Sequence, residues 1–372
     1  MAAPALRLPA LPTIRDLVKL YRLQARKNLS QNFLMDENVT DKIIKQAGRL
    51  KGYHVVEVGP GPGGLTRSIL RRLPEKLIVV EKDKRFGPTL EMLSEAFAMA
   101  NGKMDIIYED ILRTNFSTLL PEESKTDWGE RCPNICIIGN LPFSVSTHLI
   151  IRWLKAISER SGPWAFGRTR MILTFQKEVA ERLVAPPRNE QRSRLSVMAQ
   201  AWTNPKLRFH IPGSCFVPKP KVDVGVVSFE PLTTPRTDHD FKLFEKITRH
   251  VFCFPRKYSI KCISTLFPPE YQDELPIMMY KLSDLDPEIR PFELTVEEIH
   301  RLCSAYKYLV EKHPDIRDYN YRASRRLISR KKIRTVEIED YVEDEEDNED
   351  VDGQEPDNVD RQKKNDKNTV NK

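Results

Sequence analysis

Short runs of β-branched and other apolar residues alternate with helical stretches from about residue 38 to residue 230. Runs of this kind are typical of buried strands, and their alternation with helices predicts an α/β fold with a mostly parallel sheet and helices on both faces. The connection after residue 176 breaks the rhythm, so the last strands are expected to pair antiparallel. The expected strands are 54–59, 77–83, 104–111, 135–140, 170–176 and 224–229, and the expected helices include 64–72, 86–100 and 146–157.

The pattern changes after residue 230. Residues 231–239 contain two prolines and lack apolar periodicity, which is typical of a linker. Residues 240–330 have mostly helical patterning, and Thr295 and Glu298 have the spacing of a capping box. We therefore predict a sheet domain over 28–232, a smaller all-α C-terminal domain over 233–330, and a basic then acidic disordered tail over 331–372.

Charge is distributed unevenly along the 372 residues. The net charge is +7, but residues 337–372 carry 15 acidic and 5 basic residues, which leaves about +17 on residues 1–336. So basic a body indicates a polyanionic partner such as nucleic acid. Composition alone is equally compatible with a soluble, lysine-rich surface, and the choice between the two depends on the motifs.

The cysteines and the hydropathy exclude some classes of site. None of the six cysteines forms a CxxC pair, and no second pair of ligands follows Cys132 and Cys136 at zinc spacing, so we expect reduced thiols and no metal. No stretch approaches the roughly 18 uncharged apolar residues of a membrane-spanning helix. A soluble protein without a membrane partner is therefore expected. A monomer is the default expectation, because the sequence does not indicate an oligomeric state.

The N-terminal segment has two features. Residues 1–15 contain arginine but no acidic residue, which is typical of a mitochondrial presequence, although proline is frequent and serine is absent. The pattern of apolar and basic residues over 14–28 predicts a basic amphipathic helix. Its expected apolar side consists of Ile14, Leu17, Val18 and Leu20. Residues 1–27 are thus interpreted as a presequence followed by a basic helix.

A glycine-rich loop, Glu57 to Gly64, follows the first long strand and precedes a helix. Glycines allow a tight turn and let a ligand lie against bare peptide groups. Gly59, Gly61 and Gly64 fit the GxGxxG pattern of nicotinamide-binding folds, and Glu81 follows about 20 residues later. A carboxylate there could accept hydrogen bonds from a ribose, and Asp110 could accept one from an adenine amino group. At this point a nicotinamide enzyme and a methyltransferase both remain possible.

The segment Asn140-Leu141-Pro142-Phe143 ends the fourth expected strand and distinguishes the two. The exocyclic amine of adenine is a poor nucleophile because its lone pair is delocalised into the ring. An asparagine oxygen and a backbone carbonyl can accept its two N–H bonds and favour a tetrahedral nitrogen. Proline fixes the local backbone and offers no donor. The aromatic ring can stack on an extruded base, which contributes about 1–3 kcal/mol.

Together these motifs resemble the ribosomal RNA adenine N6,N6-dimethyltransferases of the KsgA/Erm type, in order and spacing over roughly residues 25–300. The resemblance implies a Rossmann-like S-adenosylmethionine-dependent methyltransferase domain. It includes an N-terminal cofactor motif at 31–34, a ribose-binding segment at 80–83, an adenine-binding segment at 109–111 and a Pro-rich loop at 216–222. The implied cofactor residues are Gln31, Asn32, Leu34, Gly59, Gly61, Glu81, Lys82, Asp110, Ile111 and Asn140, and the implied catalytic residues are Asn140, Leu141, Pro142 and Phe143.

Within this family the sequence is most similar to the mitochondrial members, on the segments 137–147, 175–183 and 191–200. That resemblance implies dimethylation of two adjacent adenosines in the 3′-terminal hairpin loop of small-subunit ribosomal RNA, in the mitochondrial matrix, during small-subunit assembly. The rival hypothesis is a transcription factor that keeps the fold and binds mitochondrial DNA or the transcription machinery. Candidate phosphate contacts are Arg192, Arg194, Lys219, Lys221, Arg256 and Lys257.

Overall fold

A seven-stranded sheet forms the centre of the computed structural model, which describes residues 8–26 and 31–321. Its strands are β2 (His54–Val58), β3 (Lys76–Glu81), β4 (Lys103–Tyr108), β5 (Ile135–Asn140), β6 (Arg170–Gln176), β7 (Thr203–Ile211) and β9 (Val224–Pro231). They lie in the order β4-β3-β2-β5-β6-β9-β7. The strands from β4 to β6 pair in parallel, whereas β9 is antiparallel to both β6 and β7. The predicted α/β fold and the antiparallel pairing of its last strands are confirmed.

All six expected strands are present, but β7 was missed. It lies at the edge of the sheet, and its side chains are alternately more and less exposed over most of its length. An edge strand tolerates a proline such as Pro205, because the missing N–H need not face a neighbour. The polar residues and the proline therefore hid a strand that lacks the apolar run of the inner strands.

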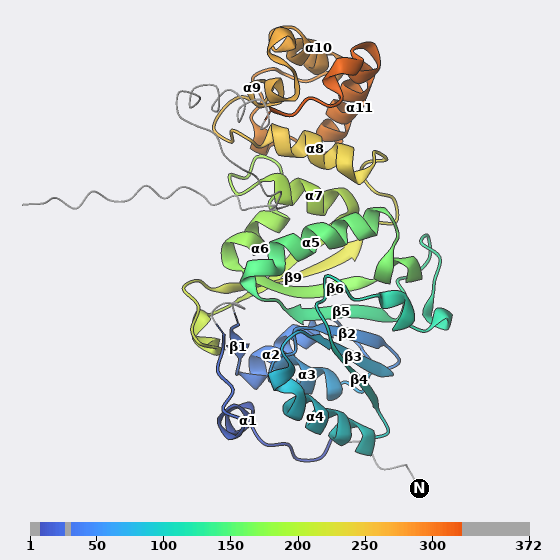
Figure 1. Cartoon of the computed structure of the whole chain (residues 1–372), viewed down its shortest axis with the longest axis vertical. Coiled ribbons are helices and arrows are strands. Elements are labelled where there is room, and N and C mark those ends of the chain that lie inside the picture. The colour runs from blue at the N-terminus through green and yellow to red at the C-terminus, as the bar shows by residue number, and fades with distance from the viewer. Residues whose placement is uncertain (1–7, 27–30, 322–372) are drawn as a thin grey trace, which may run out of the picture. The chain divides into compact units, whose positions relative to one another are not determined.

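Alternate residues of the inner strands face two separate cores. Val56 and Ile78 contribute to the core beneath α5 (Phe143–Ser158), α6 (Lys177–Val184) and α7 (Arg194–Trp202). Val55 and Leu77 contribute to the core beneath α2 (Glu37–Lys45), α3 (Gly64–Leu70) and α4 (Gly87–Met99). Because helices cover both faces of the sheet, the inner strands β2, β3 and β5 are buried along nearly their whole length rather than alternating (Figure 1).

The C-terminal part is helical. It contains α8 (Phe241–Val251), α9 (Ser259–Ile263), α10 (Leu275–Leu282) and α11 (Val296–Lys312). The predicted capping box begins α11, since Thr295 Oγ1 accepts from Glu298 N at 3.1 Å and Glu298 Oε2 accepts from Thr295 N at 2.8 Å. The Trp202 ring of α7 packs on Phe241 and Phe244 of α8, so these helices share a core with one face of the sheet. The domain boundary near residue 232 stays a prediction, and the tail over 331–372 lies outside the described residues.

The N-terminal helix is shorter than expected. The helix predicted over 14–28 is α1 (Ile14–Leu20), and Arg22 follows with a positive φ of 48°. Ile14 and Leu17 are buried, but Leu20 is 70% exposed, so its place on the apolar side was wrong. The described residues of the expected presequence begin at residue 8, and residues 1–7 lie outside the described part, so the presequence stays a prediction. Among the described residues, no helix has the length and apolar character needed to cross a membrane.

Candidate active site

A cavity lies at the carboxyl ends of β2, β3 and β5, where the chain order of the sheet reverses. The next strand in the sequence, β3, pairs with one edge of β2, and β5 pairs with the other edge. Open α/β sheets bind ligands at such a switch point because the loops diverge there. The cavity is lined by Gln31, Asn32, Phe33, Leu34, Glu57, Gly59, Pro60, Gly61, Pro62, Gly64, Leu65, Glu81, Phe86, Asn140, Leu141, Pro142 and Phe143.

Most of the residues predicted to bind the cofactor lie together in this wall, and so do all four predicted catalytic residues. Lys82, Asp110 and Ile111 do not belong to the wall. Lys82 Nζ and Asp110 Oδ2 form an ion pair of 2.8 Å across the ends of β3 and β4, and Ile111 packs against the core. The roles of these three residues in cofactor binding stay a prediction, as do the roles of the predicted residues that lie in the wall.

Glu81 fixes the glycine loop. Its carboxylate accepts hydrogen bonds from Gly61 N at 3.0 Å and from Asp83 N at 2.8 Å. Gly61 has a φ of 54°, a left-handed conformation that favours glycine. Burial raises the pKa of Glu81, and these two backbone donors offset part of that rise. The carboxylate therefore joins the end of β3 to the loop that follows β2.

The N-terminal motif is held against this loop by close packing. A Cβ on Gly64 would lie 2.7 Å from the carbonyl oxygen of Leu34, so a larger residue would force the two segments apart. Leu34 belongs to β1 (Phe33–Leu34), which pairs antiparallel with β8 (Phe216–Val217). Two motifs that lie about 180 residues apart in the sequence, the N-terminal motif and the Pro-rich loop, are thereby joined in one small sheet.

Glu57 is a site residue that the sequence reasoning did not single out, although it begins the glycine-loop motif. It is fully buried in the wall, and neither of its carboxylate oxygens has a hydrogen-bond partner. Burial raises its pKa to about 8. The hydroxyl and the backbone N–H of Thr66 lie near enough to offset part of this rise in pKa, although neither contact has the geometry of a hydrogen bond. An unpartnered buried carboxyl is costly, and a cationic ligand would relieve that cost.

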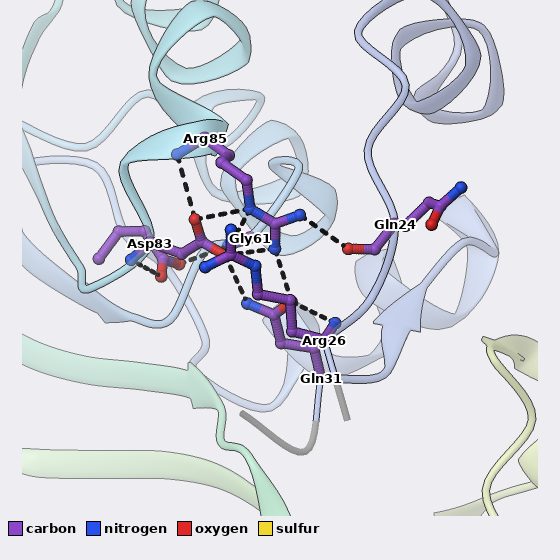
Figure 2. A network of polar contacts seen from close by, with 7 residues as sticks. Gln24, Arg26, Gln31, Gly61, Asp83 and Arg85 are labelled. Carbon is purple, nitrogen blue, oxygen red and sulfur yellow. Dashed lines mark hydrogen bonds and ion pairs between the residues drawn. The ribbon is translucent and has the colours of Figure 1, made fainter. Parts of the chain in front are cut away.

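Arg85 connects the N-terminal segment to the end of β3 (Figure 2). Its guanidinium binds Asp83, with Nη2 at 2.6 Å from Oδ2, and it donates to the carbonyl of Gln24 at 3.1 Å. Gln31 closes the network, because its Nε2 donates to Asp83 Oδ2 at 3.1 Å and its Oε1 accepts from Arg26 N at 3.0 Å. The hydrogen bonds from Arg85 lower the pKa of Asp83 to about 2. The side chain of Gln31 is therefore oriented by an ion pair.

The amide of Asn140 is held by two hydrogen bonds at the end of β5. Its Oδ1 accepts from Thr174 Oγ1 at 2.7 Å, and its Nδ2 donates to the carbonyl of Asn32 at 3.2 Å. Thr174 lies on β6 directly opposite Asn140 in the parallel register. No local motif marks Thr174, and only the pairing of β5 with β6 could have identified it. One lone pair of the Asn140 oxygen is left to accept a further N–H.

The other three catalytic candidates have different surroundings. Leu141 is buried in the core, and Pro142 precedes the first residue of α5, so its missing N–H costs no helical hydrogen bond. Phe143 is that first residue and is only partly buried. An aromatic ring in the cavity wall is thus available for stacking.

The candidate phosphate contacts separate into two groups. The prediction that Arg192 contacts phosphate is wrong. Its guanidinium is buried and donates to the carbonyls of Leu294 and Ala185 and to the amide oxygen of Gln200. Arg194 is partly exposed beside Glu245. Lys219, Lys221, Arg256 and Lys257 are exposed.

Comparison with known proteins supports the fold and identifies the family. A family described as "Ribosomal RNA adenine dimethylase" matches residues 22–285. A dimethyladenosine transferase from Plasmodium falciparum has a TM-score of 0.56 at 22% identity over 74% of this chain and 98% of its own. The 23S rRNA methyltransferase ErmE has a TM-score of 0.51 at 18% identity over 74% and 99%. These two structures show a shared Rossmann-like methyltransferase fold, and the antiparallel β9 separates it from the nicotinamide-binding strand order.

Curated relatives are much closer in sequence. "Dimethyladenosine transferase 1, mitochondrial" of Xenopus laevis is 49% identical over 91% of this chain and 97% of its own length. The human protein of the same name is 50% identical over 90% and 95%. Identity at this level over nearly the whole of both chains agrees with the family match and shows the family of this chain. The chain belongs to the ribosomal RNA adenine dimethylase family.

Proposed function

We propose that this protein uses S-adenosylmethionine to dimethylate the N6 atoms of two adjacent adenosines in the 3′-terminal hairpin loop of mitochondrial small-subunit ribosomal RNA. It would act in the mitochondrial matrix, on the assembling small subunit. The family and the names of the relatives support the reaction and the organelle. The observation that carries the proposal is the Asn140 amide, which is held by Thr174 and Asn32 in the wall of a cavity that also contains two buried carboxyls.

The residues of the cavity fit the cofactor. S-adenosylmethionine, when bound, supplies an electrophilic methyl group on a positively charged sulfur and also carries an ammonium group. The unpartnered carboxyl of Glu57 would compensate this positive charge. Glu81 would accept from the ribose hydroxyls in exchange for its bonds to Gly61 and Asp83, and the glycine loop would lie against the ligand.

The target adenine would be held on the opposite side by Asn140 and Phe143. The Oδ1 atom of Asn140 has a lone pair left after its bond to Thr174, and it would accept an N–H of the adenine amine. Accepting that bond favours a tetrahedral nitrogen whose lone pair is available for displacement at the methyl carbon. Phe143 would stack on the base after it leaves the RNA loop, because the base cannot be reached while it is stacked.

Catalysis of this kind depends on positioning rather than on a general base. The proton of the amine can leave after the methyl group has transferred, so no strongly basic side chain is required. Holding two reactants in line can contribute about 7–11 kcal/mol in favourable cases. The fixed amide of Asn140, which cannot rotate without losing bonds to Thr174 or Asn32, is the group that the structure offers for this purpose.

The test is incubation of the purified protein with labelled S-adenosylmethionine and the small-subunit hairpin RNA, beside a hairpin with a mutated loop. We expect label on the intact hairpin alone, recovered as N6,N6-dimethyladenosine. Asn140→Ala should lose roughly 10²–10³ in the single-turnover rate, as expected for one oriented polar group. Asn134→Ala is the matched control, because its exposed side chain precedes the other end of β5.

Two outcomes would contradict the proposal. A rate of Asn140→Ala within threefold of wild type would remove Asn140 from its assigned role. An absence of transfer to the intact hairpin, by a protein shown to bind the cofactor, would favour the hypothesis of a nucleic-acid-binding transcription factor. Glu81→Ala should mainly weaken cofactor affinity, and unchanged calorimetric affinity would refute the role of Glu81.

A further inference from the structure

A cluster of metal-ligating side chains lies outside the cavity, where the linker after β9 meets α11. Asp238 and His239 belong to the linker, and His300 lies in the first half of α11. One donor atom from each of these three side chains lies within 4.8 Å of the other two. None of the three residues lines the cavity described above. The cluster is therefore separate from the residues assigned to methyl transfer.

The linker is held in this place independently of the cluster. Arg236 N donates to the carbonyl of Ala201 at 2.9 Å, and the Arg236 side chain pairs with Glu297 of α11 at 3.7 Å. Thr237 is buried, and its hydroxyl accepts from His239 N at 3.3 Å. The backbone thus brings the three side chains together before any ion binds, which lowers the entropic cost of forming a site.

Hydroxyl groups orient the two imidazoles. The Nδ1 atom of His300 lies 3.2 Å from Thr237 Oγ1, and Nε2 of His239 lies 2.9 Å from Ser304 Oγ. Ser304 lies one turn after His300 on α11. A hydroxyl of the linker therefore contacts the histidine of α11, and a hydroxyl of α11 contacts the histidine of the linker. The centroids of the two imidazole rings lie 4.6 Å apart, and the ring planes form an angle of 33°. The rings are thus close enough for one ion to reach both. In the absence of an ion, these contacts hold both rings where the linker meets α11.

We propose that Asp238, His239 and His300 bind one divalent transition-metal ion, with zinc as the expected ion and water in the fourth position. Two imidazoles and a carboxylate suit zinc, and they offer too few oxygens for calcium or magnesium. Bonds of about 2.0–2.2 Å in a tetrahedron place neighbouring donors roughly 3.4 Å apart. Asp238 Oδ1 and His300 Nδ1 are already 3.5 Å apart, and the exposed side chain of Asp238 is free to adjust.

The ion would fasten the linker to a helix about 60 residues further along the chain. It would therefore act as a structural staple for the helices α8 to α11 rather than as part of the reaction. The Thr237 and Ser304 hydroxyls would then be displaced to neighbouring positions or would bind the water ligand.

The experiment uses the full chain without a histidine tag, stripped with chelator and titrated with zinc chloride by calorimetry. We expect one equivalent to bind, and zinc to raise the melting temperature. His239→Gln and His300→Gln should each weaken the affinity by at least about tenfold, in line with the loss of a ligand-shell residue. His148→Gln is the matched control, because His148 is exposed on α5 and outside the cluster.

Cysteines are the competing ligands, so cobalt provides a second measurement. Tetrahedral cobalt bound by imidazole and carboxylate shows visible absorption without a thiolate charge-transfer band, and we expect that spectrum. The proposal is overturned by an absence of saturable zinc binding, by a thiolate band, or by wild-type affinity in the double variant His239→Gln/His300→Gln. Unchanged cofactor affinity in the variants shows that they are folded.

Discussion

The guanidinium of Arg85 binds the carboxylate of Asp83, with Nη2 and Oδ2 2.6 Å apart, while its Nη1 donates to the carbonyl of Gln24 at 3.1 Å. Asp83 in turn binds Gln31 in the cavity wall. The Arg85 side chain is only partly exposed and that of Asp83 is almost fully buried, so solvent screens this ion pair little. It is thus suited to hold the N-terminal segment beside the cofactor site.

The first prediction concerns this ion pair. Arg85→Ala should weaken the affinity for S-adenosylmethionine by about tenfold or more and leave kcat nearly unchanged, because the residue orients Gln31 without touching the reacting atoms. Arg85→Lys should restore only part of the affinity, since an ammonium cannot reproduce the fork geometry. Calorimetry and the split between KM and kcat check this. Lys84→Ala is the matched control on an exposed neighbour, and equal effects of the two alanine variants would refute the role of Arg85.

The second prediction concerns pH. The unliganded protein keeps a proton on Glu57 up to about pH 8, and a cationic cofactor binds better to the ionised form. The affinity for S-adenosylmethionine should therefore rise with pH toward about 8, by up to about tenfold per unit, and then level off. The stability of the unliganded fold changes in the opposite direction. Its free energy of unfolding falls as pH rises from 4.5 to about 8, because the unfolded chain releases the Glu57 proton at lower pH than the folded protein does. Calorimetric titrations across this range should show a smaller slope for Glu57→Gln, and an identical slope would contradict the assignment.

The third prediction separates orientation from binding at Asn140. Thr174→Val keeps the shape of the side chain but removes the hydroxyl that donates to Asn140 Oδ1. The single-turnover rate should fall by about tenfold, because the amide can then rotate, while the cofactor affinity should change little. Thr174→Ser should recover most of the rate. Equal loss in the serine and valine variants would mean that the methyl group, not the hydroxyl, matters.

The fourth prediction concerns the contact between the glycine loop and β1. Gly64→Ala places a methyl group 2.7 Å from the Leu34 carbonyl, so β1 must move away from the cavity. Cofactor affinity should fall by at least about tenfold, because Leu34 and the glycine loop both line the cavity and would no longer be preorganised together for the ligand. Gly129→Ala is the control, because a Cβ there would meet no atom within 4 Å. A Gly64→Ala variant that binds the cofactor normally would show that β1 does not shape the site.

The fifth prediction tests whether α1 is part of the folded protein. Ile14→Ala and Leu17→Ala should each lower the free energy of unfolding by about 2–5 kcal/mol, as buried aliphatic truncations do. Leu20→Ala, at an exposed position of the same helix, should change it by less than about 0.5 kcal/mol. Urea unfolding measures all three. If all three changes are small, α1 is dispensable, and a cleaved presequence could extend through it.

Local patterns predicted the inner strands, the glycine loop and the capping box, because each depends on neighbours in the sequence. The residues that the sequence missed depend on neighbours in space. Thr174 reaches Asn140 through the register of β5 and β6, and Arg85 reaches Gln31 across more than 50 residues. Arginine usually lies at the surface, so the sequence favours an exposed Arg192. In the structure its buried guanidinium instead donates hydrogen bonds to two backbone carbonyls inside the fold.

The histidine cluster shows the same limit. Cysteine spacing could exclude a local zinc motif, but it could not exclude ligands that come from two distant segments. Asp238 and His239 have no special spacing to His300, and their proximity depends on the linker lying along α11.

The strand order also has a consequence for how the chain is made. The strand β9 lies between β6 and β7 although it comes last of the three in the sequence. A ribosome releases β6 first, so its edge, with Met171, Leu173 and Phe175, stays unpaired until residue 231 has emerged. An apolar strand edge that waits in this way is a template for aggregation. Nascent chains that stop before β9 should therefore need chaperones to stay soluble.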